Sequence, residues 1–174
     1  IQATKLTKVY GEKETSVTAL DNIDVQFNEN EFTAIMGPSG SGKSTLLHCL
    51  AGLDRPTSGQ ILLKDQDIST LNDKQLTKIR RDSFGFVFQA FNLIPTLTAE
   101  ENITLPASIA GRKPDMDWIK QVVETVDISD RLTHRPNELS GGQQQRVAAA
   151  RAMATKPEVI FADEPSGNLD SKSS

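Results

Sequence analysis

The sequence predicts an α/β fold with a mostly parallel sheet. Short apolar runs typical of strands alternate with longer segments typical of helices. One such run leads directly into a glycine-rich segment that opens a helix, and another, at 159–162, ends in two carboxylates. The chain has 174 residues, of which 37% are hydrophobic and 24% charged, enough for one domain core with a small subdomain.

Each expected element follows from a local pattern. Strands are predicted from apolar runs bounded by turn residues, and helices from apolar residues at a spacing of three or four. Proline and glycine clusters mark the breaks between them, and Pro106 and Pro114 are expected to interrupt the helical region. The predicted strands are 25–27, 32–36, 61–63, 84–88 and 159–162, the last a buried parallel strand, and the helical segments are 44–53, 98–130 and 141–154.

Composition argues against several classes of protein. The net charge is −4 and Lys and Arg are scattered, which argues against a nucleic acid as the main partner. No apolar run approaches the ~18 residues that span a bilayer, and no signal peptide pattern is present. A role in a membrane process would therefore be played from the cytosolic side, docked on another polypeptide. The single cysteine, Cys49, fits a reducing compartment and a small buried position better than a redox role.

A phosphate-binding loop is predicted at 37–44, which matches G-x-x-x-x-G-K-[ST] in full. Its residues are Gly37, Pro38, Ser39, Gly40, Ser41, Gly42, Lys43 and Ser44, and Thr45 completes the expected nucleotide-binding set. Glycines let backbone N–H groups point at a polyphosphate, and the following helix presents its N-terminus to the anion. Lys43 would place its charge on the β- and γ-phosphates, and the Ser44 hydroxyl would ligate Mg²⁺.

Two carboxylates, Asp163 and Glu164, follow the predicted strand 159–162. A buried parallel strand brings the residues that follow it to the carboxyl edge of the sheet, where ligand sites of α/β proteins lie. Asp163 would hold Mg²⁺ through water, and Glu164 would act as the general base that polarises an attacking water. Together with the phosphate loop, the pair predicts an ATPase with Mg²⁺ as cofactor.

A second Ser/Gly turn opens the helix at 141–154 and forms a second anion site. Its residues are Leu139, Ser140, Gly141, Gly142 and Gln143. This pentapeptide resembles the signature of the ABC ATPase family, and the resemblance covers essentially the whole chain. It implies a P-loop NTPase fold with a RecA-like core, a small N-terminal antiparallel β subdomain and a helical subdomain that bears the signature. It also implies a head-to-tail homodimer, in which the signature of one subunit completes the ATP site of the other.

The resemblance implies three parts of the chain. Residues 1–89 would form the ATP-binding core with the antiparallel β subdomain, and 90–156 the helical subdomain. Residues 157–174 would return to the core, the remainder of which is absent. In the family the chain continues and its next strand ends in a histidine at the γ-phosphate, a context that neither His48 nor His134 matches. We therefore expect this chain to be poorly active, and its sheet to be distorted unless that gap is filled.

Smaller motifs occur in the order that the family implies. Tyr10 matches the aromatic residue that stacks on adenine, and Gln89 matches the glutamine that contacts Mg²⁺ and the attacking water. The alternatives are a half-exposed tyrosine at a strand end and a surface loop glutamine. Residues 167–170, Gly-Asn-Leu-Asp, match the loop that crosses the dimer interface, with a plain polar turn as the alternative.

The stretches 46–54, 86–95 and 162–170 look like the bacterial branch that includes lipoprotein-releasing, macrolide-export and bacitracin-resistance ATPases. This implies export or extraction through a separate membrane permease, with the chain cytoplasmic and peripheral on the inner face of the membrane. An apolar patch of Phe91, Leu93, Ile94 and Pro95 suits a groove for a permease helix, and core packing explains the same residues equally well.

Other functions remain as alternatives. ABC-type ATPases of DNA repair carry a long coiled-coil insertion between the phosphate loop and the signature, and translation-factor relatives carry two modules. Neither feature is present in the 174 residues. A binding module that senses ATP without hydrolysing it is a third alternative, against which the intact Glu164 argues.

Overall fold

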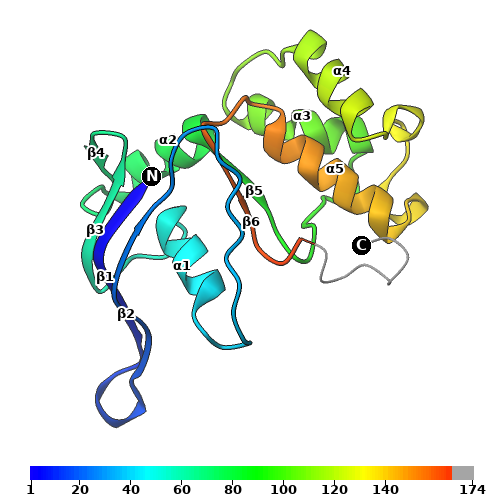
Figure 1. Cartoon of the computed structure of the whole chain (residues 1–174). Coiled ribbons are helices and arrows are strands. Elements are labelled where there is room, and N and C mark those ends of the chain that lie inside the picture. The colour runs from blue at the N-terminus through cyan, green and yellow to red at the C-terminus, as the bar shows by residue number, and fades with distance from the viewer. Residues whose placement is uncertain (166–174) are drawn as a thin grey trace. The chain divides into compact units, whose positions relative to one another are not determined.

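The computed structural model describes residues 1–165, which fall into two compact units (Figure 1). The first unit is Ile1–Lys78 and the second begins at Ile79. Each has a sheet of its own, with four strands in the first and two in the second. The division into 1–89, 90–156 and 157–174 stays a prediction.

The first unit is built on an antiparallel sheet with the strand order β2-β1-β3-β4. Its strands are β1 (Gln2–Tyr10), β2 (Val17–Gln26), β3 (Ser58–Leu63) and β4 (Gln66–Asp67), and a short 3₁₀ helix, η1 (Lys13–Thr15), lies in the β1–β2 hairpin. Leu6 and Ile61 are buried in neighbouring strands of this sheet. The sheet is the small N-terminal antiparallel β subdomain that the sequence predicts.

Two helices complete the first unit up to its boundary. They are α1 (Lys43–Leu50) and α2 (Asp73–Ser83), which runs across Lys78. Cys49 on α1 is fully buried, and this burial raises the pKa of its thiol to about 11, as expected for a small core residue. Helix α2 was not predicted, although Asn72 and Gln75 exchange backbone and side-chain hydrogen bonds at its start. That reciprocal pair is a capping signal that the sequence contains.

The predicted strand at 32–36 is wrong, because residues 31–38 form no regular secondary structure. Phe32 is 98% exposed and Met36 is 88% exposed. A strand exists only where its backbone N–H and C=O groups pair with a neighbour. No segment within residues 1–165 pairs with this one, so its apolar pattern alone does not produce a strand.

The second unit contains a parallel pair of strands, β5 (Phe84–Val87) and β6 (Val159–Ala162). Residues 84–87 lie opposite 159–162 in register, and the rings of Phe84 and Phe161 meet edge to face at 5.2 Å. The parallel direction agrees with the sequence prediction, but full burial of 159–162 does not. Phe161 is buried whereas Ile160 is 47% exposed, because within the described residues β6 is paired on one side only.

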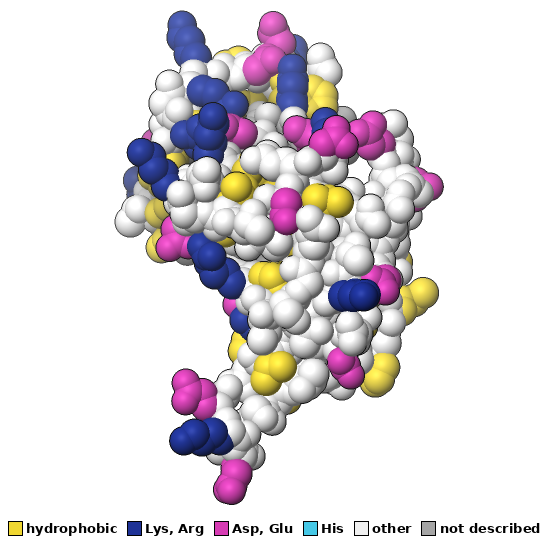
Figure 2. All heavy atoms as spheres, turned by 90° about the vertical axis from the view of Figure 1, so that its left-hand side faces the viewer, with side chains coloured by type: hydrophobic (Ala, Val, Ile, Leu, Met, Phe, Trp, Pro, Cys, Tyr) yellow, Lys and Arg dark blue, Asp and Glu magenta, His cyan; other side chains and the backbone are white. Residues whose placement is uncertain are grey.

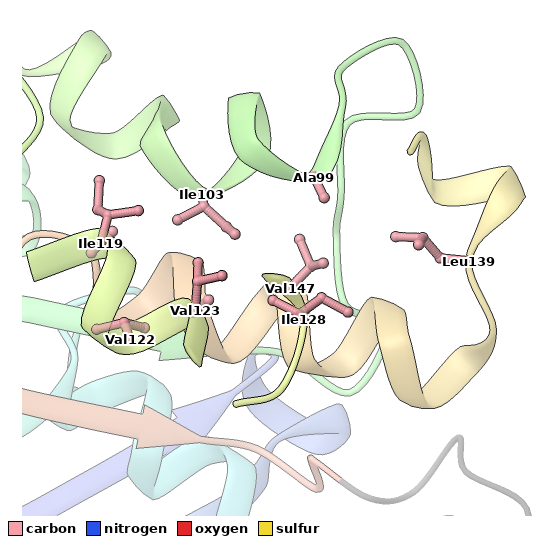
Figure 3. Packing of buried hydrophobic residues seen from close by; sticks show 10 residues of the cluster. Ala99, Ile103, Ile119, Val122, Val123, Ile128, Leu139 and Val147 are labelled. Carbon is pink, nitrogen blue, oxygen red and sulfur yellow. The ribbon is translucent and has the colours of Figure 1, made fainter. Parts of the chain in front are cut away.

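Besides the end of α2, the described part of the second unit contains three α-helices and two 3₁₀ helices. They are α3 (Ala99–Ile109), α4 (Met116–Thr125), η2 (Ser129–Arg131), η3 (Pro136–Glu138) and α5 (Gly141–Met153). Figure 3 shows apolar side chains from α3, α4 and α5 pointing toward one another, among them Ile103, Val123 and Val147. Because these helices share one core, the signature helix α5 has a fixed support.

Pro106 does not break the helical region as predicted, since it lies inside α3. A proline in a helix interior costs ~3 kcal/mol through a lost hydrogen bond and a clash. Burial of Ile103 and Ala107 on the same helix offsets this cost. Pro114 behaves as predicted, because it lies in the loop before Asp115, the N-cap of α4.

No helix within residues 1–165 combines the length and apolar character that crossing a bilayer requires. Figure 2 shows one face of the molecule, on which acidic and basic side chains are interspersed.

Candidate nucleotide site

The glycine-rich loop of the first unit turns sharply into α1. The Ser41 N–H donates to the Pro38 carbonyl at 3.3 Å, and Gly42 is the N-cap of the helix with φ of +87°. A Cβ on Gly42 would lie 2.4 Å from the Ala19 carbonyl oxygen and 3.2 Å from a methyl group of Leu20. Both the left-handed backbone and the close approach of β2 therefore require glycine at this position.

The ammonium of Lys43 lies against the loop backbone. Its Nζ donates to the carbonyl oxygens of Gly37 at 3.0 Å and Pro38 at 2.8 Å. Gly40 has φ of +77° and open space where a Cβ would be. Ser44 lies in the first turn of α1, at the end of the helix that carries partial positive charge. The loop thus combines a cation, a helix N-terminus and uncrowded backbone, which is the chemistry that a polyphosphate needs.

Tyr10 ends β1 and is 41% exposed. Its hydroxyl donates to Asp54 Oδ2 at 2.6 Å, and the same carboxylate accepts from Lys8 Nζ through Oδ1 at 2.6 Å. Lys8 Nζ also donates to the Arg55 carbonyl at 2.7 Å and lies 4.7 Å from the centroid of the Tyr10 ring. The ring is therefore tethered at its hydroxyl and covered in part by a cation, while much of it remains open.

The charges around Tyr10 shift two pKa values. Burial and the hydrogen bond to Asp54 raise the pKa of Tyr10, against an opposing hydrogen bond with Thr45, so the phenol remains a donor. Burial alone would raise the pKa of Asp54, but hydrogen bonds from Lys8 and Tyr10 outweigh it and lower that pKa. Because Thr45 lies on α1, the tyrosine and the helix of the phosphate loop meet.

Sequence reasoning missed the roles of Lys8 and Asp54. They are 46 residues apart and come together only through the folding of the first unit. The signal available was the position of Asp54 just after α1, within a stretch that resembles the family.

In the second unit, Gln89 and Asp163 lie at the same edge of the parallel pair. The Asp163 N–H donates to the Val87 carbonyl at 3.0 Å, and Gln89 comes two residues after that strand end. Glu164 is exposed and has φ of +42°, a left-handed conformation that is strained for a glutamate.

Mg²⁺ requires hard oxygen ligands, and the predicted set of Ser44, Gln89 and Asp163 offers a hydroxyl, an amide and a carboxylate. The donor chemistry fits the ion. Among the described residues no three His, Cys, Asp or Glu side chains gather into a metal cluster, and the predicted set contains only one such residue. Ser44 belongs to the first unit and the other two to the second, so the complete set stays a prediction.

Ser140 is the N-cap of α5, the helix that bears the signature. Its hydroxyl accepts from the Gln143 N–H at 3.3 Å, and Gln143 Oε1 accepts from the Ser140 N–H at 2.9 Å. A Cβ on Gly141 would meet nothing within 4 Å. The signature is thus a capping box with open space at its first helical residue. Capping accounts for the serine and the glutamine, and an anion-binding role for 140–143 stays a prediction.

The apolar residues after Gln89 fall into two groups, one packed in the core and one exposed. Phe91 is buried, and Leu93 packs against the helical core, while Ile94 and Pro95 are exposed. Core packing therefore explains the first two residues, and a partner could contact the other two.

The second unit also contains a pocket of about 250 Å³ that the sequence did not predict. It is lined by Glu100, Met116, Ile119, Lys120, Val123, Glu124, Ser129 and Leu132. No motif marks it, because five of its eight lining residues are spaced along α4 and the others come from α3, η2 and the residue after η2.

The predicted site residues thus form two groups. The first unit brings Tyr10 and Thr45 to the phosphate loop, and the second holds Gln89, Asp163, Glu164 and the signature. The predicted interface loop at 167–170 lies outside the described residues.

Comparison with known proteins identifies the family. Residues 20–167 match the sequence profile of the family described as ABC transporter. An uncharacterized ABC transporter ATP-binding protein of Thermotoga maritima is 52% identical over 167 residues, or 95% of this chain and 71% of that protein. The lipoprotein-releasing system ATP-binding protein LolD of Cytophaga hutchinsonii is 46% identical, over 98% of this chain and 77% of LolD. The macrolide export ATP-binding/permease protein MacB of Marinobacter nauticus is 48% identical, over 100% of this chain and 27% of MacB.

A solved structure agrees with the sequence relatives. The ABC transporter cassette MJ0796 of Methanocaldococcus jannaschii, solved as a dimer, matches with a TM-score of 0.88 and 46% identity. The match covers 99% of this chain and 77% of MJ0796. These similarities confirm the predicted P-loop NTPase fold. The chain therefore belongs to the ABC transporter family, whose ATP-binding proteins it matches over nearly its whole length.

Proposed function

We propose that this chain binds ATP and hydrolyses it to power export or extraction through a membrane permease. The observation that carries the proposal is the loop before α1, where Gly42 is required by its backbone and Lys43 holds its ammonium against the loop carbonyls. A polyphosphate entering this loop would accept hydrogen bonds from Lys43 in place of those carbonyls. Charge-assisted contacts of this type are stronger than neutral ones, which favours the exchange.

Adenine binds on the open part of the Tyr10 ring. The hydrogen bond to Asp54 sets the direction of the ring, and the contact with Thr45 keeps it near the phosphate loop. A ring offers a π-face to any base, so this contact contributes affinity with little selectivity among bases.

Ser44, Gln89 and Asp163 would hold Mg²⁺, which neutralises charge on the phosphates. Glu164 accepts a proton from the attacking water, and Lys43 stabilises the charge that develops on the transferred phosphoryl group. The ATPase activity of the family supports this assignment, as does the state of MJ0796 solved with ADP and Pi after hydrolysis.

Two copies of the chain pair head to tail around ATP. The phosphate loop and the signature each open a helix with its N-terminus, so one chain contains two anion sites. One nucleotide uses both only if the signature comes from a second copy. The dimeric structure of MJ0796 supports this arrangement.

The permease partner contacts the exposed part of the segment after Gln89, Ile94 and Pro95. The name of MacB joins an ATP-binding and a permease function in one protein, and LolD is named for lipoprotein release. By analogy, this chain works at the inner face of the cell membrane, docked on its permease.

Calorimetry of ATP binding tests the proposal. Lys43→Ala should weaken ATP binding by ~1.5–3 kcal/mol, roughly 10- to 100-fold, because it removes the cation from the loop. Lys74→Ala, which changes an exposed lysine on α2, serves as the matched control and should leave the affinity unchanged. Equal affinity of the Lys43→Ala variant and the parent chain would contradict the proposed site.

A further inference from the structure

Arg151, near the end of α5, makes a forked contact with the segment after Gln89. Its Nη1 donates to the Asn92 carbonyl and its Nη2 to the Phe91 carbonyl, both at 2.6 Å. These residues are 59 and 60 positions away in the chain, and the contact lies wholly within the second unit.

The turn that receives this fork has an unfavourable backbone. Phe91 has φ of +55° and Asn92 φ of +48°, a left-handed conformation that is rare for a bulky residue such as phenylalanine and more readily adopted by asparagine. The turn is closed further by hydrogen bonds from the Phe91 N–H to the Phe88 carbonyl and from the Asn92 N–H to the Ala90 carbonyl. A phenylalanine in this conformation persists only where its surroundings hold it in place.

The described hydrogen bonds of the Arg151 guanidinium all go to this turn. Arg151 is half-buried, and burial lowers its pKa. Arg151 belongs to none of the ion pairs found among residues 1–165, so its described hydrogen bonds go to two backbone carbonyls and to no carboxylate. The planar fork of arginine can reach two such acceptors at once, which a lysine ammonium does with less defined geometry.

Asn102 on α3 holds the rest of the segment. This side chain is fully buried and accepts from the Ile94 N–H at 2.8 Å. Its Nδ2 lies within hydrogen-bonding distance of the carbonyls of Ile94, Leu97 and Thr98, at 3.1, 3.2 and 2.9 Å. The segment 91–98 is therefore fastened to two helices of the same core.

We propose that Arg151 is a positioning residue for hydrolysis, which holds the 91–92 turn and thereby sets Gln89 relative to the signature helix. The inference rests on the proposed function in assigning Gln89 to the reacting site. It also means that the segment with the exposed Ile94 and Pro95 is attached to α5 through Arg151 and to α3 through Asn102.

Hydrogen exchange measured by mass spectrometry tests the fork directly, in the whole chain and without nucleotide. Arg151→Lys keeps the charge and most of the stem but loses the planar fork. We expect peptides covering 88–97 to exchange roughly tenfold faster, and peptides covering α3 and α4 to be unchanged. Arg112→Lys is the matched control, because Arg112 is an exposed arginine that donates to the Asp82 carboxylate and the Arg81 carbonyl.

Unchanged exchange at 88–97 would overturn the proposal. So would an equal rise in α3 and α4, since Arg151 would then support the core in general. Arg151→Gln, which retains N–H donors without the charge, is the second variant should Arg151→Lys fail to fold. It should give the same selective increase.

Steady-state ATPase kinetics provides the readout that a purely structural role would not move, and because variant and parent chain are compared as a ratio, the low turnover expected of this chain is sufficient. Arg151→Lys should lower kcat roughly tenfold and leave KM for ATP unchanged, because the phosphate loop and Tyr10 belong to the other unit. A raised KM with unchanged kcat would overturn the proposal. A parent chain that binds no ATP would refute the proposed function, whereas hydrogen exchange would still decide whether Arg151 holds the turn.

Discussion

Tyr10 is fixed by three neighbours from different parts of the first unit. Asp54 accepts its hydrogen bond, Lys8 lies over its ring and Thr45 reaches it from α1. A tyrosine at the end of an exposed strand would otherwise adopt several rotamers, and ordering it on binding would cost affinity. The three contacts orient the ring before the nucleotide arrives.

Tyr10→Ala should weaken ATP binding by ~1–3 kcal/mol, the range for stacking of a base on an aromatic ring. Binding of inorganic triphosphate should be unaffected, because that ligand has no base. Tyr10→Phe is the control, since it keeps the ring and loses only the hydrogen bond to Asp54. Calorimetry with both ligands distinguishes the roles, and equal losses for ATP and triphosphate would mean that Tyr10 is structural.

Asp54 should make the stability of the chain depend on pH. Its pKa in the folded state is lowered, so its charged form stabilises the fold above the ordinary aspartate value of about 3.9. This contribution is lost as the pH falls through the folded-state pKa. At pH 7, Asp54→Asn should lower the free energy of unfolding by about 1–2 kcal/mol, and the difference should shrink as the pH falls through the folded-state pKa of Asp54.

Urea unfolding of both proteins at pH 7, 5 and 3 measures this effect of Asp54→Asn. Asp65→Asn controls for a general loss of acidic charge, because Asp65 is an exposed aspartate in the β3–β4 turn. A difference between the parent chain and Asp54→Asn that stays constant with pH would mean that the ion pair with Lys8 contributes nothing.

At the scale of elements, the start of α1 depends on the glycine before it. Gly42→Ala should lower the free energy of unfolding by at least ~2 kcal/mol. A left-handed alanine costs ~1–2 kcal/mol, and its Cβ would also lie 2.4 Å from the Ala19 carbonyl oxygen. Thermal unfolding followed by circular dichroism measures the loss.

Gly40→Ala separates the two causes, because Gly40 shares the left-handed backbone but has open space around it. It should lose only the conformational part, ~1–2 kcal/mol. If Gly40→Ala were as destabilising as Gly42→Ala, the approach of β2 to the loop would not matter for stability.

At the scale of the whole molecule, the proposed ATP site is shared between two copies of the chain. Glu164→Gln should bind ATP normally and hydrolyse it very slowly, since the amide keeps the size of the side chain and loses its basicity. The unhydrolysed nucleotide should then convert monomers into dimers, as measured by light scattering at saturating ATP and Mg²⁺. Adding Lys43→Ala should abolish this dimer, and a monomer in the Glu164→Gln variant would contradict the head-to-tail model.

Local patterns were sufficient for much of the fold. The helix at 141–154, the short strands at 61–63 and 84–88 and the turn at 37–42 follow from residue spacing, glycine and capping, which act within a few positions of the chain. The phosphate loop and the signature could be located for the same reason. Each motif is a continuous run of residues, and those residues by themselves determine the local backbone conformation that the motif requires.

Contacts between segments that are distant in sequence decided the parts of the fold and of the site that local patterns did not predict. The segment 32–36 has the pattern of a strand and forms none without a neighbour, while Pro106 stays helical because α3 is held in a core. Neither the tether of Tyr10 by Asp54 nor the fork of Arg151 follows from spacing, since each joins residues more than 40 positions apart. Backbone pairing and side-chain hydrogen bonds depend on which groups the folded chain brings within about 3 Å, and only the tertiary structure determines that.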